Sequence, residues 1–267
     1  MNSGELTAKV YIVGAGPGAP DLITVRGQRI LQQADVLLYT DSLVPSELVA
    51  CAKPTATVYK TAGMALDEMV GIMVEGVQSG HSVARVHTGD PSIFGAILEQ
   101  MVLLRKAGVA YEVVPGVSSV FAAAAAVGAE LTVPDLTQTV ILTRVGGRTP
   151  MPDGESLREL ATHRCTMAFY LSATLAKTVV QELTAAGWPP ETPVAVVQKA
   201  TWPEQKIIRT NLSRLVRAMG DAHISNHAIL LVGFALDEAL LEQDQHRSKL
   251  YDETFTHRYR KGVIGND

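Results

Sequence analysis

The chain has 267 residues, 47% of them hydrophobic, and a formal net charge of −4. This length and apolar content suffice for one large or two modest α/β domains. The acidic balance argues against a surface built to hold a nucleic-acid backbone, which needs clustered lysine and arginine, so we expect no nucleic-acid partner.

The cysteines and the N-terminus indicate the cellular compartment. Cys51 and Cys165 lie far apart in apolar segments without metal-ligand spacing, which is typical of free buried thiols in a reducing compartment and predicts no metal site. The N-terminus has no signal-peptide pattern, and the apolar run VFAAAAAVGA is well short of the ~20 residues that span a bilayer. The sequence therefore predicts a cytoplasmic protein that does not enter a membrane.

Short apolar runs alternate with segments of helical period along the first half of the chain. The pattern predicts strands over 9–14, 36–39, 57–60, 82–87 and 111–116, and helices over 24–34, 45–52, 66–78 and 96–108. This alternation indicates a mostly parallel sheet with helices on its faces. The pattern pauses at Pro115-Gly116, before an alanine-rich helix and a turn at 133–135, and predicts a domain boundary there.

The second half repeats the alternation less regularly. Expected strands 193–200 and 205–211 are joined by so short a loop that they can pair antiparallel, which predicts a mixed second sheet. The fold class is therefore α/β, with two α/β domains and a ligand cleft between them. The expected organisation is an N-terminal domain over 1–116, a C-terminal domain over 117–240 and a polar tail over 241–267.

A glycine-rich loop, GAGPGAPDLIT, follows the first expected strand at residues 14–24. Gly14, Gly16 and Ala19 satisfy the G-x-G-x-x-A fingerprint of NAD-dependent oxidoreductases. In that fingerprint the helix begins inside the glycine run, whereas here two prolines interrupt the loop and helical period starts only after Thr24, a favourable N-cap. The spacing favours a turn that permits close backbone approach over a phosphate cradle.

A second turn, HTGDPSIFG, occupies residues 87–95 between an expected strand and an expected helix. Ligands bind at the carboxyl ends of strands in open α/β sheets. Glycine, aspartate and proline are also the commonest residues of ordinary turns. Taken alone, this turn leaves both interpretations open.

The turn HTGDPSIFG is one of seven segments that occur in a fixed order along the chain. They are GAGPGAPDLIT, YTDSLV, TAGM, HTGDPSIFG, EVVPGVSS, QTVILTR with GGRTPMP, and PVAVVQKATWPEQKI. Together they resemble the tetrapyrrole methylases that use S-adenosylmethionine, over nearly the whole chain. The resemblance implies a class III methyltransferase fold, S-adenosylmethionine as cofactor with S-adenosylhomocysteine as product, a small-molecule tetrapyrrole substrate and a homodimer. YTDSLVP, TAGM and RTPMP further resemble members that methylate carbon 11 of precorrin-4, or of its cobalt form, in cobalamin biosynthesis.

The same resemblance implies which residues contact the cofactor, through backbone groups and small or apolar side chains. Carried over by position, these are Pro17, Thr88, Gly89, Asp90, Ile93, Ser118, Ser119, Leu171 and Ala200. Two positions depart from the family pattern: Ala19 stands where many relatives have aspartate, and Leu171 stands where many have methionine, which keeps apolar contact but loses the polarisable sulfur.

Methyl transfer from a sulfonium to carbon is an in-line displacement that needs no covalent protein nucleophile, so positioning is the expected main contribution. Loss of a ring proton would need an acceptor. Asp41 and His87 are candidates for proton acceptance or substrate positioning, and Tyr39 is a candidate substrate contact. Each also has a structural alternative: a turn carboxylate, a strand-end hydrogen-bonding group and a core ring, respectively.

A polycarboxylate substrate requires local positive charge on this acidic chain. Arg144 and Arg148 are the preferred candidates because they flank a glycine pair in a family-like segment. Other candidates at strand ends are Lys60, Arg85, Lys199 and Arg209.

Four alternatives remain open. The first is another tetrapyrrole methylase, either a uroporphyrinogen methyltransferase or a precorrin methylase that acts at another carbon. The second is a methylase of related fold that modifies ribosomal RNA or a translation factor. The chain could also be an NAD oxidoreductase, or a corrinoid carrier without catalysis, which would bind a tetrapyrrole but no S-adenosylmethionine.

Overall fold

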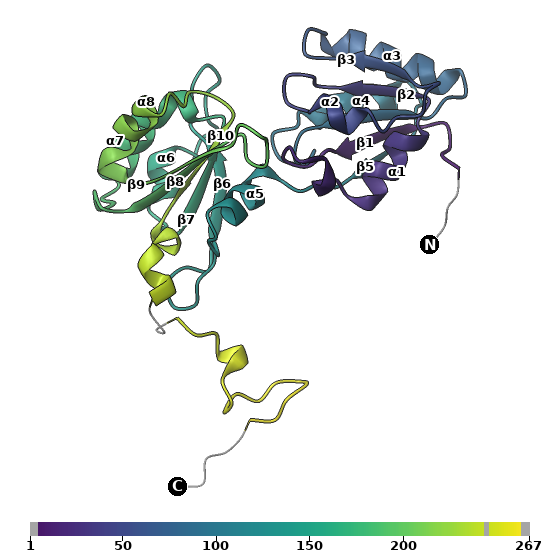
Figure 1. Cartoon of the computed structure of the whole chain (residues 1–267). Coiled ribbons are helices and arrows are strands. Elements are labelled where there is room, and N and C mark those ends of the chain that lie inside the picture. The colour runs from purple at the N-terminus through teal and green to yellow at the C-terminus, as the bar shows by residue number, and fades with distance from the viewer. Residues whose placement is uncertain (1–4, 243–245, 263–267) are drawn as a thin grey trace. The chain divides into compact units, whose positions relative to one another are not determined.

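The computed structural model describes residues 5–242 and 246–262 (Figure 1). The chain divides into two compact units: Met1–Ala122 together with Lys199–Gln205 form unit 1, and Ala123–Gln198 together with Lys206–Asp267 form unit 2. Seven residues from the second half of the sequence are thus part of unit 1.

Unit 1 contains a five-stranded sheet in which every neighbouring pair is parallel, in the order β3-β2-β4-β1-β5. This confirms the parallel sheet predicted for the first half. Its strands are β1 (Val10–Gly14), β2 (Val36–Tyr39), β3 (Thr57–Lys60), β4 (Val83–His87) and β5 (Tyr111–Val114). Its helices are α1 (Val25–Gln33), α2 (Ser46–Val49), α3 (Leu66–Gln78) and α4 (Ile97–Lys106), with a 3-10 turn η1 (Pro20–Leu22) before α1.

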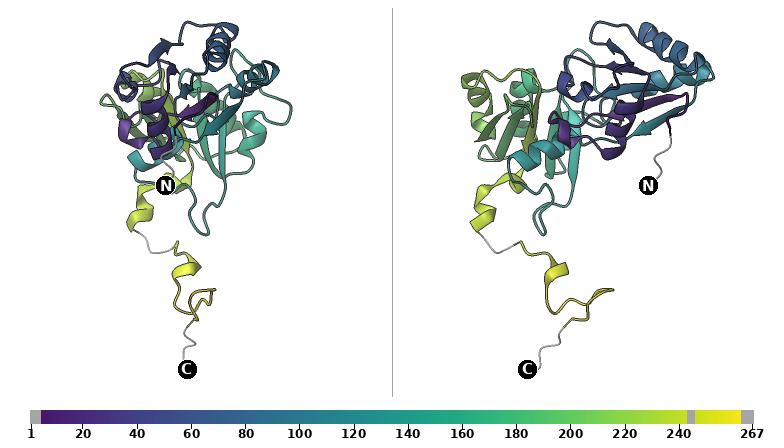
Figure 2. Two further views of the ribbon diagram at one scale, coloured as in Figure 1. Left: turned by 90° about the vertical axis from the view of Figure 1, so that its right-hand side faces the viewer. Right: turned by 45° about the vertical axis from the view of Figure 1, so that its right-hand side comes forward.

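Helices cover both faces of this sheet, as Figures 1 and 2 show. Side chains of α1 and α2, such as Leu31 and Leu48, pack with Leu37 on one face. On the other face, Met73 of α3 and Leu104 of α4 pack against alternate strand residues. Successive strand residues point to opposite faces, so a strand covered on both sides is apolar throughout, which explains the uninterrupted runs in the sequence.

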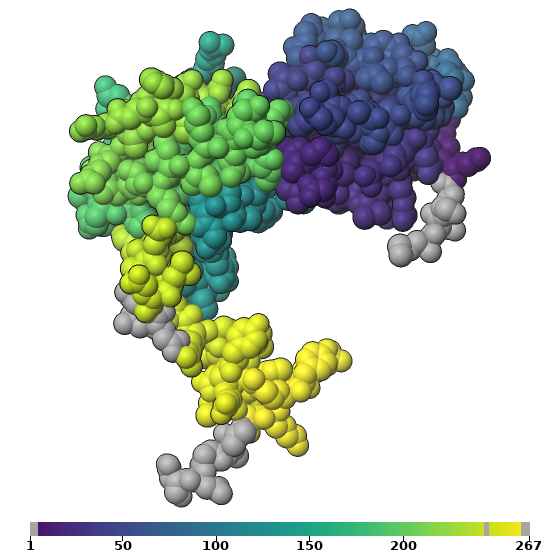
Figure 3. Space-filling view, viewed as in Figure 1, coloured from purple at the N-terminus to yellow at the C-terminus, as the bar shows by residue number. Residues whose placement is uncertain are grey.

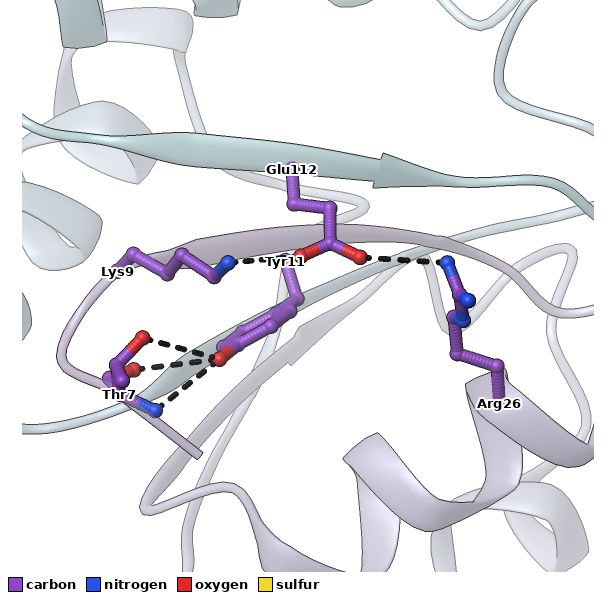
Figure 4. A network of polar contacts seen from close by, with 5 residues as sticks. All are labelled: Thr7, Lys9, Tyr11, Arg26 and Glu112. Atoms are coloured by element: carbon purple, nitrogen blue, oxygen red, sulfur yellow. Dashed lines mark hydrogen bonds and ion pairs between the residues drawn. The ribbon is translucent and has the colours of Figure 1, made fainter. Parts of the chain in front are cut away.

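Polar contacts join the amino-terminal ends of β1 and β5 (Figure 4). Lys9 Nζ lies 2.7 Å from a carboxylate oxygen of Glu112, and Arg26 of α1 lies 3.6 Å from the other oxygen. The hydrogen bond to Glu112 raises the pKa of Lys9. All three side chains are partly or largely exposed, so these ion pairs add little stability, but they tie the edge strand β5 to β1 and α1.

The helix boundaries follow from capping residues. The hydroxyl of Thr24 accepts a hydrogen bond from the backbone N–H of Gly27 at 3.1 Å, as expected for the N-cap of α1. In unit 2, Ser156 and Glu159 form a reciprocal capping box at the start of α6 (Leu157–Ala161). The predicted alanine-rich helix is α5 (Ser119–Ala126), which runs across the boundary between the units.

Unit 2 contains a mixed five-stranded sheet in the order β6-β7-β10-β8-β9. The pair β8 (Pro193–Gln198) and β9 (Lys206–Asn211) is antiparallel, as predicted from their short connection. The other strands are β6 (Val140–Arg144), β7 (Thr166–Tyr170) and β10 (Ala228–Val232). The remaining α-helices are α7 (Ala176–Ala185) and α8 (Leu215–Asp221). The remaining 3-10 turns are η2 (Ala173–Leu175), η3 (Leu212–Arg214), η4 (Phe234–Leu236), η5 (Glu238–Glu242) and η6 (Lys249–Tyr251).

One face of this sheet packs on α6, α7 and α8 around Phe169, Leu183 and Leu215, all of which are fully buried. Burial of each such side chain contributes about 1.5 to 3 kcal/mol of transfer free energy. Cys165 is buried in this unit as a free thiol, and Cys51 in unit 1 is also free.

After β10 the only helical elements of the described chain are 3-10 turns. Ala235 and Leu236 of η4 are buried, whereas Tyr251 and Tyr259, near the end of the described chain (yellow in Figure 3), are 79% and 85% exposed. Parts of the expected polar tail, 243–245 and 263–267, lie outside the described residues. None of the helices in the described ranges is long and apolar enough to cross a membrane.

Candidate functional site

Three glycines meet where the neighbouring strands β4, β1 and β5 end. A methyl group on Gly116 would lie 2.2 Å from the carbonyl oxygen of Gly89, and a methyl group on Gly14 would lie 2.6 Å from the Cα of Gly116. Contacts this short between a Cβ and backbone atoms cannot be accommodated without moving the backbone. The loops after these strands can therefore come this close only because residues 14 and 116 are glycines, whereas residue 89 favours glycine through its positive φ of 62°.

Backbone hydrogen bonds hold the first two loops together. Gly16 and Gly89 form an isolated antiparallel bridge, with N–H···O distances of 3.2 and 2.8 Å, and Ala15 donates to the carbonyl of His87 at 2.7 Å. The glycine-rich loop thus pairs with the Gly-Asp-Pro turn, and α1 begins nine residues beyond Gly16, at Val25. Its glycines serve contact between loops, which supports the prediction of a close-approach turn.

Asp90 links the Gly-Asp-Pro turn to the loop after β5. One carboxylate oxygen accepts a hydrogen bond from the N–H of Gly116 at 2.9 Å, and the other accepts from the backbone and hydroxyl of Ser92. Burial opposes the charged form of Asp90, but the hydrogen bonds from Ser92 and Gly116 outweigh it and hold the pKa below its ordinary value. The carboxylate therefore organises the loops.

The chain after Asp90 is strained. Phe94 and Ala96 have φ of 54° and 49°, in the left-handed region, and a methyl group on Gly95 would lie 2.2 Å from the carbonyl oxygen of Pro91. Left-handed non-glycine residues cost free energy and concentrate at functional sites. Lys199 and Thr201, in the family-like segment 193–207, and Leu171, after β7, also have positive φ.

The residues expected to contact the cofactor fall mostly in unit 1. Gly89 adjoins the loop after β5, because a methyl group on it would lie 3.7 Å from the Cα of Ser118 and 3.8 Å from the N of Ser119. Thr88 is exposed and Ile93 half-buried. The remaining expected contacts of unit 1 are Pro17, Asp90 and Ala200. Leu171 belongs to unit 2, where its side chain is 72% exposed.

His87 and Arg85 form a buried polar pair on β4. Burial and the charge of Arg85 lower the pKa of His87 to about 3, against the opposing effect of Gln100, so the imidazole is neutral at pH 7. Its Nε2 atom has no hydrogen-bond partner among the described residues. An imidazole with so low a pKa is a weak base, which argues against His87 as a proton acceptor.

Arg85 connects the ends of β2 and β3. Its guanidinium donates to the hydroxyls of Thr40 and Thr61 at 3.3 Å each and to the carbonyl of Val86 at 3.2 Å. Burial lowers the pKa of Arg85 to about 10, so it remains charged at neutral pH. No carboxylate of the described chain lies within 4 Å of this cation, which makes it an uncompensated buried charge.

Asp41 and Tyr39 lie at the end of β2. Asp41 is exposed, and its carboxylate accepts a hydrogen bond from the backbone N–H of Ala62 at 3.2 Å. Tyr39 is 5% exposed and packs in the core shared with α1 and α2. The carboxylate of Asp41 therefore joins the loops after β2 and β3.

The two preferred arginines lie in unit 2. Arg144 donates to the carbonyls of Thr149 and Pro150 at 3.1 and 2.8 Å, so its guanidinium shapes the loop that follows β6. Arg148 is exposed within that loop. Of these two side chains, Arg148 is therefore the one that a ligand in solvent can reach.

Sequence reasoning missed the contacts of Trp202 and Thr201 with the glycine-rich loop. Trp202 Nε1 donates to the carbonyl of Pro17 at 3.0 Å, and the N–H of Ala19 donates to the hydroxyl of Thr201 at 2.9 Å. The only signal was a tryptophan beside a proline in the loop between two expected strands, which does not reveal a partner about 185 residues away.

The family described as Tetrapyrrole (Corrin/Porphyrin) Methylases matches residues 9–216. The chain therefore belongs to the tetrapyrrole methylases and is a methyltransferase. This confirms the resemblance seen in the seven segments.

Two named relatives within this family are similar to the chain over nearly its whole length. The cobalt-precorrin-4 C(11)-methyltransferase of Priestia megaterium is 61% identical over 255 residues, covering 96% of this chain and 98% of the relative. The precorrin-4 C(11)-methyltransferase of Pseudomonas aeruginosa is 43% identical over 253 residues, covering 95% and 99%.

Two solved structures of methyltransferases are also similar to this chain. The X-ray structure of a cobalt precorrin-4 methyltransferase matches with a TM-score of 0.85 and 60% identity, covering 86% of this chain and 96% of that one. A uroporphyrin-III C-methyltransferase from Thermus thermophilus, complexed with S-adenosylhomocysteine, matches with a TM-score of 0.71 and 28% identity, covering 85% and 98%.

We predict that Gly116→Ala lowers the free energy of unfolding by about 1 to 3 kcal/mol, because its methyl group must displace the backbone of the loop after β4. Gly71→Ala in α3 is the control: its methyl group meets open space and should raise stability by up to about 1 kcal/mol. Urea unfolding followed by circular dichroism measures both. Equal stability of Gly116→Ala and wild type would show that the loops are not held at contact distance.

We predict that His87 makes the protein less stable as the pH falls. The folded pKa is about 3, whereas the unfolded pKa is about 6.5. Between these values the unfolded chain binds a proton that the folded chain does not, so stability is full above pH 6.5 and is lost as the pH falls towards 3. From pH 7 to pH 5 this amounts to about 2 kcal/mol.

Unfolding of His87→Gln at pH 7 and pH 5 measures this effect, since the variant lacks the titrating group and should lose less stability than wild type. His163→Gln, at an exposed position, should keep the wild-type dependence. A His87→Gln curve parallel to that of wild type would contradict a neutral buried imidazole.

Proposed function

We propose that the loops at the carboxyl ends of β1, β4 and β5 bind S-adenosylmethionine. The observation that carries this proposal is the chemistry of the three loops: residues 14–24, 88–95 and 115–119 meet at glycines and contain no lysine or arginine. Such a surface suits a ligand held through backbone groups and apolar contact, and it offers no side-chain cation to a pyrophosphate. The Thermus relative crystallised with S-adenosylhomocysteine supports the same ligand here.

We propose Pro17, Thr88, Gly89, Asp90, Ile93, Ser118, Ser119, Leu171 and Ala200 as the residues that contact it. Asp90 has a second role: its oxygens accept hydrogen bonds from Ser92 and Gly116, so it also shapes the loops that contact the cofactor.

The proposed substrate is a precorrin-4 macrocycle, methylated at carbon 11. The 61% identical relative is named for the cobalt form and the 43% identical relative for the metal-free form. Identity therefore favours cobalt-precorrin-4, in which the cobalt is part of the substrate. Cobalamin biosynthesis is the corresponding pathway.

When bound, S-adenosylmethionine supplies an electrophilic methyl group on a sulfonium. The chain contributes positioning, since the glycine contacts and the Asp90 to Gly116 hydrogen bond hold the loops at fixed distances. Holding the reacting atoms about 3 to 3.5 Å apart supplies several kcal/mol of rate acceleration. His87 is buried and, with a pKa of about 3, only weakly basic, so among the candidate proton acceptors Asp41, which is exposed at the end of β2, is favoured.

We further propose a homodimer in the cytoplasm. Leu98 and Val102, one turn apart on α4, are 71% and 43% exposed, and Phe94 in the preceding turn is 46% exposed. An exposed apolar stripe of this kind is typical of a surface that a second protein covers. The proposal predicts a mass in solution of twice the chain's 28.5 kDa, which light scattering measures.

The first experiment is isothermal calorimetry of the purified protein with S-adenosylhomocysteine and, as a control ligand, reduced nicotinamide adenine dinucleotide. We expect binding of S-adenosylhomocysteine alone, because the loops suit a ligand without phosphate. Methylation assays with metal-free and cobalt-loaded precorrin-4 would then identify the substrate. Binding of the nicotinamide dinucleotide alone would overturn the proposal in favour of an oxidoreductase.

We predict that Arg148→Ala raises the KM for the tetrapyrrole about tenfold, the loss expected for one charge-assisted hydrogen bond, and leaves the Kd for S-adenosylhomocysteine unchanged. Arg217→Ala is the control, because Arg217 is an exposed arginine of the same unit, on α8. Steady-state kinetics and calorimetry measure the two constants. Loss of both in Arg148→Ala would mean that the residue is structural.

A further inference from the structure

Residues 199–205, here called the strap, leave unit 2 after β8, join unit 1 and return to unit 2 at β9. Within unit 1 the strap binds the glycine-rich loop twice. Trp202 Nε1 donates to the carbonyl of Pro17 at 3.0 Å, and the Thr201 hydroxyl accepts from the N–H of Ala19 at 2.9 Å. These bonds fall on either side of Gly18, so they fix the backbone of three successive residues.

The Trp202 ring also occupies the space beside Gly18. A methyl group on Gly18 would lie 2.2 Å from Cδ1 and 2.4 Å from Nε1 of the indole, and 2.9 Å from the Thr201 hydroxyl oxygen. Gly18 is needed here for contact, since its φ lies outside the left-handed region. The Trp202 ring therefore packs directly against the backbone of the glycine-rich loop. This contact is possible because residue 18 has no side chain.

The strap is held in an unfavourable backbone conformation. Lys199 and Thr201 have φ of 48° and 69°, and a positive φ is a true outlier for a β-branched threonine. Gln205 stabilises this turn by accepting the N–H of Thr201 at 2.7 Å, and the Lys199 ammonium lies 5.5 Å from the Trp202 ring centre and 3.5 Å from Glu204. Strain that persists because surrounding contacts enforce it is typical of residues that shape a ligand site.

We propose that Trp202 and Thr201 are positioning residues for the cofactor: they hold residues 17–19 in the conformation that binds S-adenosylmethionine. This inference rests on the proposed function, in which Pro17 is a cofactor contact. A loop already in its bound conformation loses less conformational entropy on binding, so its affinity is higher than that of a loop free to move. Trp202 and Thr201 act on the loop and need not touch the ligand themselves.

Paired substitutions test the two hydrogen bonds. Trp202→Phe keeps an aromatic ring and removes the N–H donor, whereas Thr201→Val keeps the shape and removes the acceptor. Each should weaken S-adenosylhomocysteine binding about three- to tenfold, the equivalent of one hydrogen bond. Thr201→Ser retains the hydroxyl and should restore binding to within about twofold of wild type.

Trp188→Phe is the matched control, because Trp188 in unit 2 is the chain's other tryptophan and its Nε1 also donates to a backbone carbonyl, that of Ala161 at 2.8 Å. It loses the same kind of bond and should lower thermal stability while leaving the Kd for S-adenosylhomocysteine unchanged. Calorimetry and thermal unfolding are measured on all five proteins, wild type included.

The outcomes separate the inference from the proposed function. Wild type that does not bind S-adenosylhomocysteine overturns both. Wild-type binding with an unchanged Kd in Trp202→Phe and Thr201→Val overturns only the positioning role. Should Trp202→Phe fail to fold, the Thr201→Val and Thr201→Ser pair decides: weaker binding in the first with recovery in the second supports the role, and equal binding in both overturns it.

Discussion

The contact among Gly14, Gly89 and Gly116 is the constraint on which the rest of the candidate site depends. Three neighbouring parallel strands end at one edge of the sheet, but their loops can touch there only because residues 14 and 116 have no Cβ. Once they touch, the bridge between Gly16 and Gly89 and the bond from Gly116 to Asp90 form at normal distances. Short backbone contact thus sets the shape of the surface offered to a ligand.

Charge is arranged around this surface in a way that suits positioning better than acid–base chemistry. Asp90 uses its carboxylate to join two loops, and Arg85 uses its guanidinium to join the ends of β2 and β3. The same buried cation helps to keep His87 neutral. A methyl transfer that needs correct geometry and no protein nucleophile is compatible with a site whose ionised groups mainly brace its loops.

Much of the fold could be predicted because its signals are local. The apolar runs of β1 and β2 are continuous because helices cover both sheet faces, and Thr24 marks the start of α1 through its own hydroxyl. The antiparallel pair β8 and β9 followed from the length of their connection. The order of strands and the exchange of residues 199–205 into unit 1 depend on contacts between distant segments, which no local pattern encodes.

The α/β class, the positions of most strands and helices, and the family follow from the amino-acid sequence, because these depend on periodicity, capping residues and ordered motifs. The roles of the individual polar groups follow from the three-dimensional fold instead. His87 is neutral because of burial and a neighbouring cation, the oxygens of Asp90 are occupied by Ser92 and Gly116, and Trp202 reaches a loop 185 residues away. Each depends on atoms brought together across the fold, and pKa values and hydrogen-bond partners are properties of those surroundings.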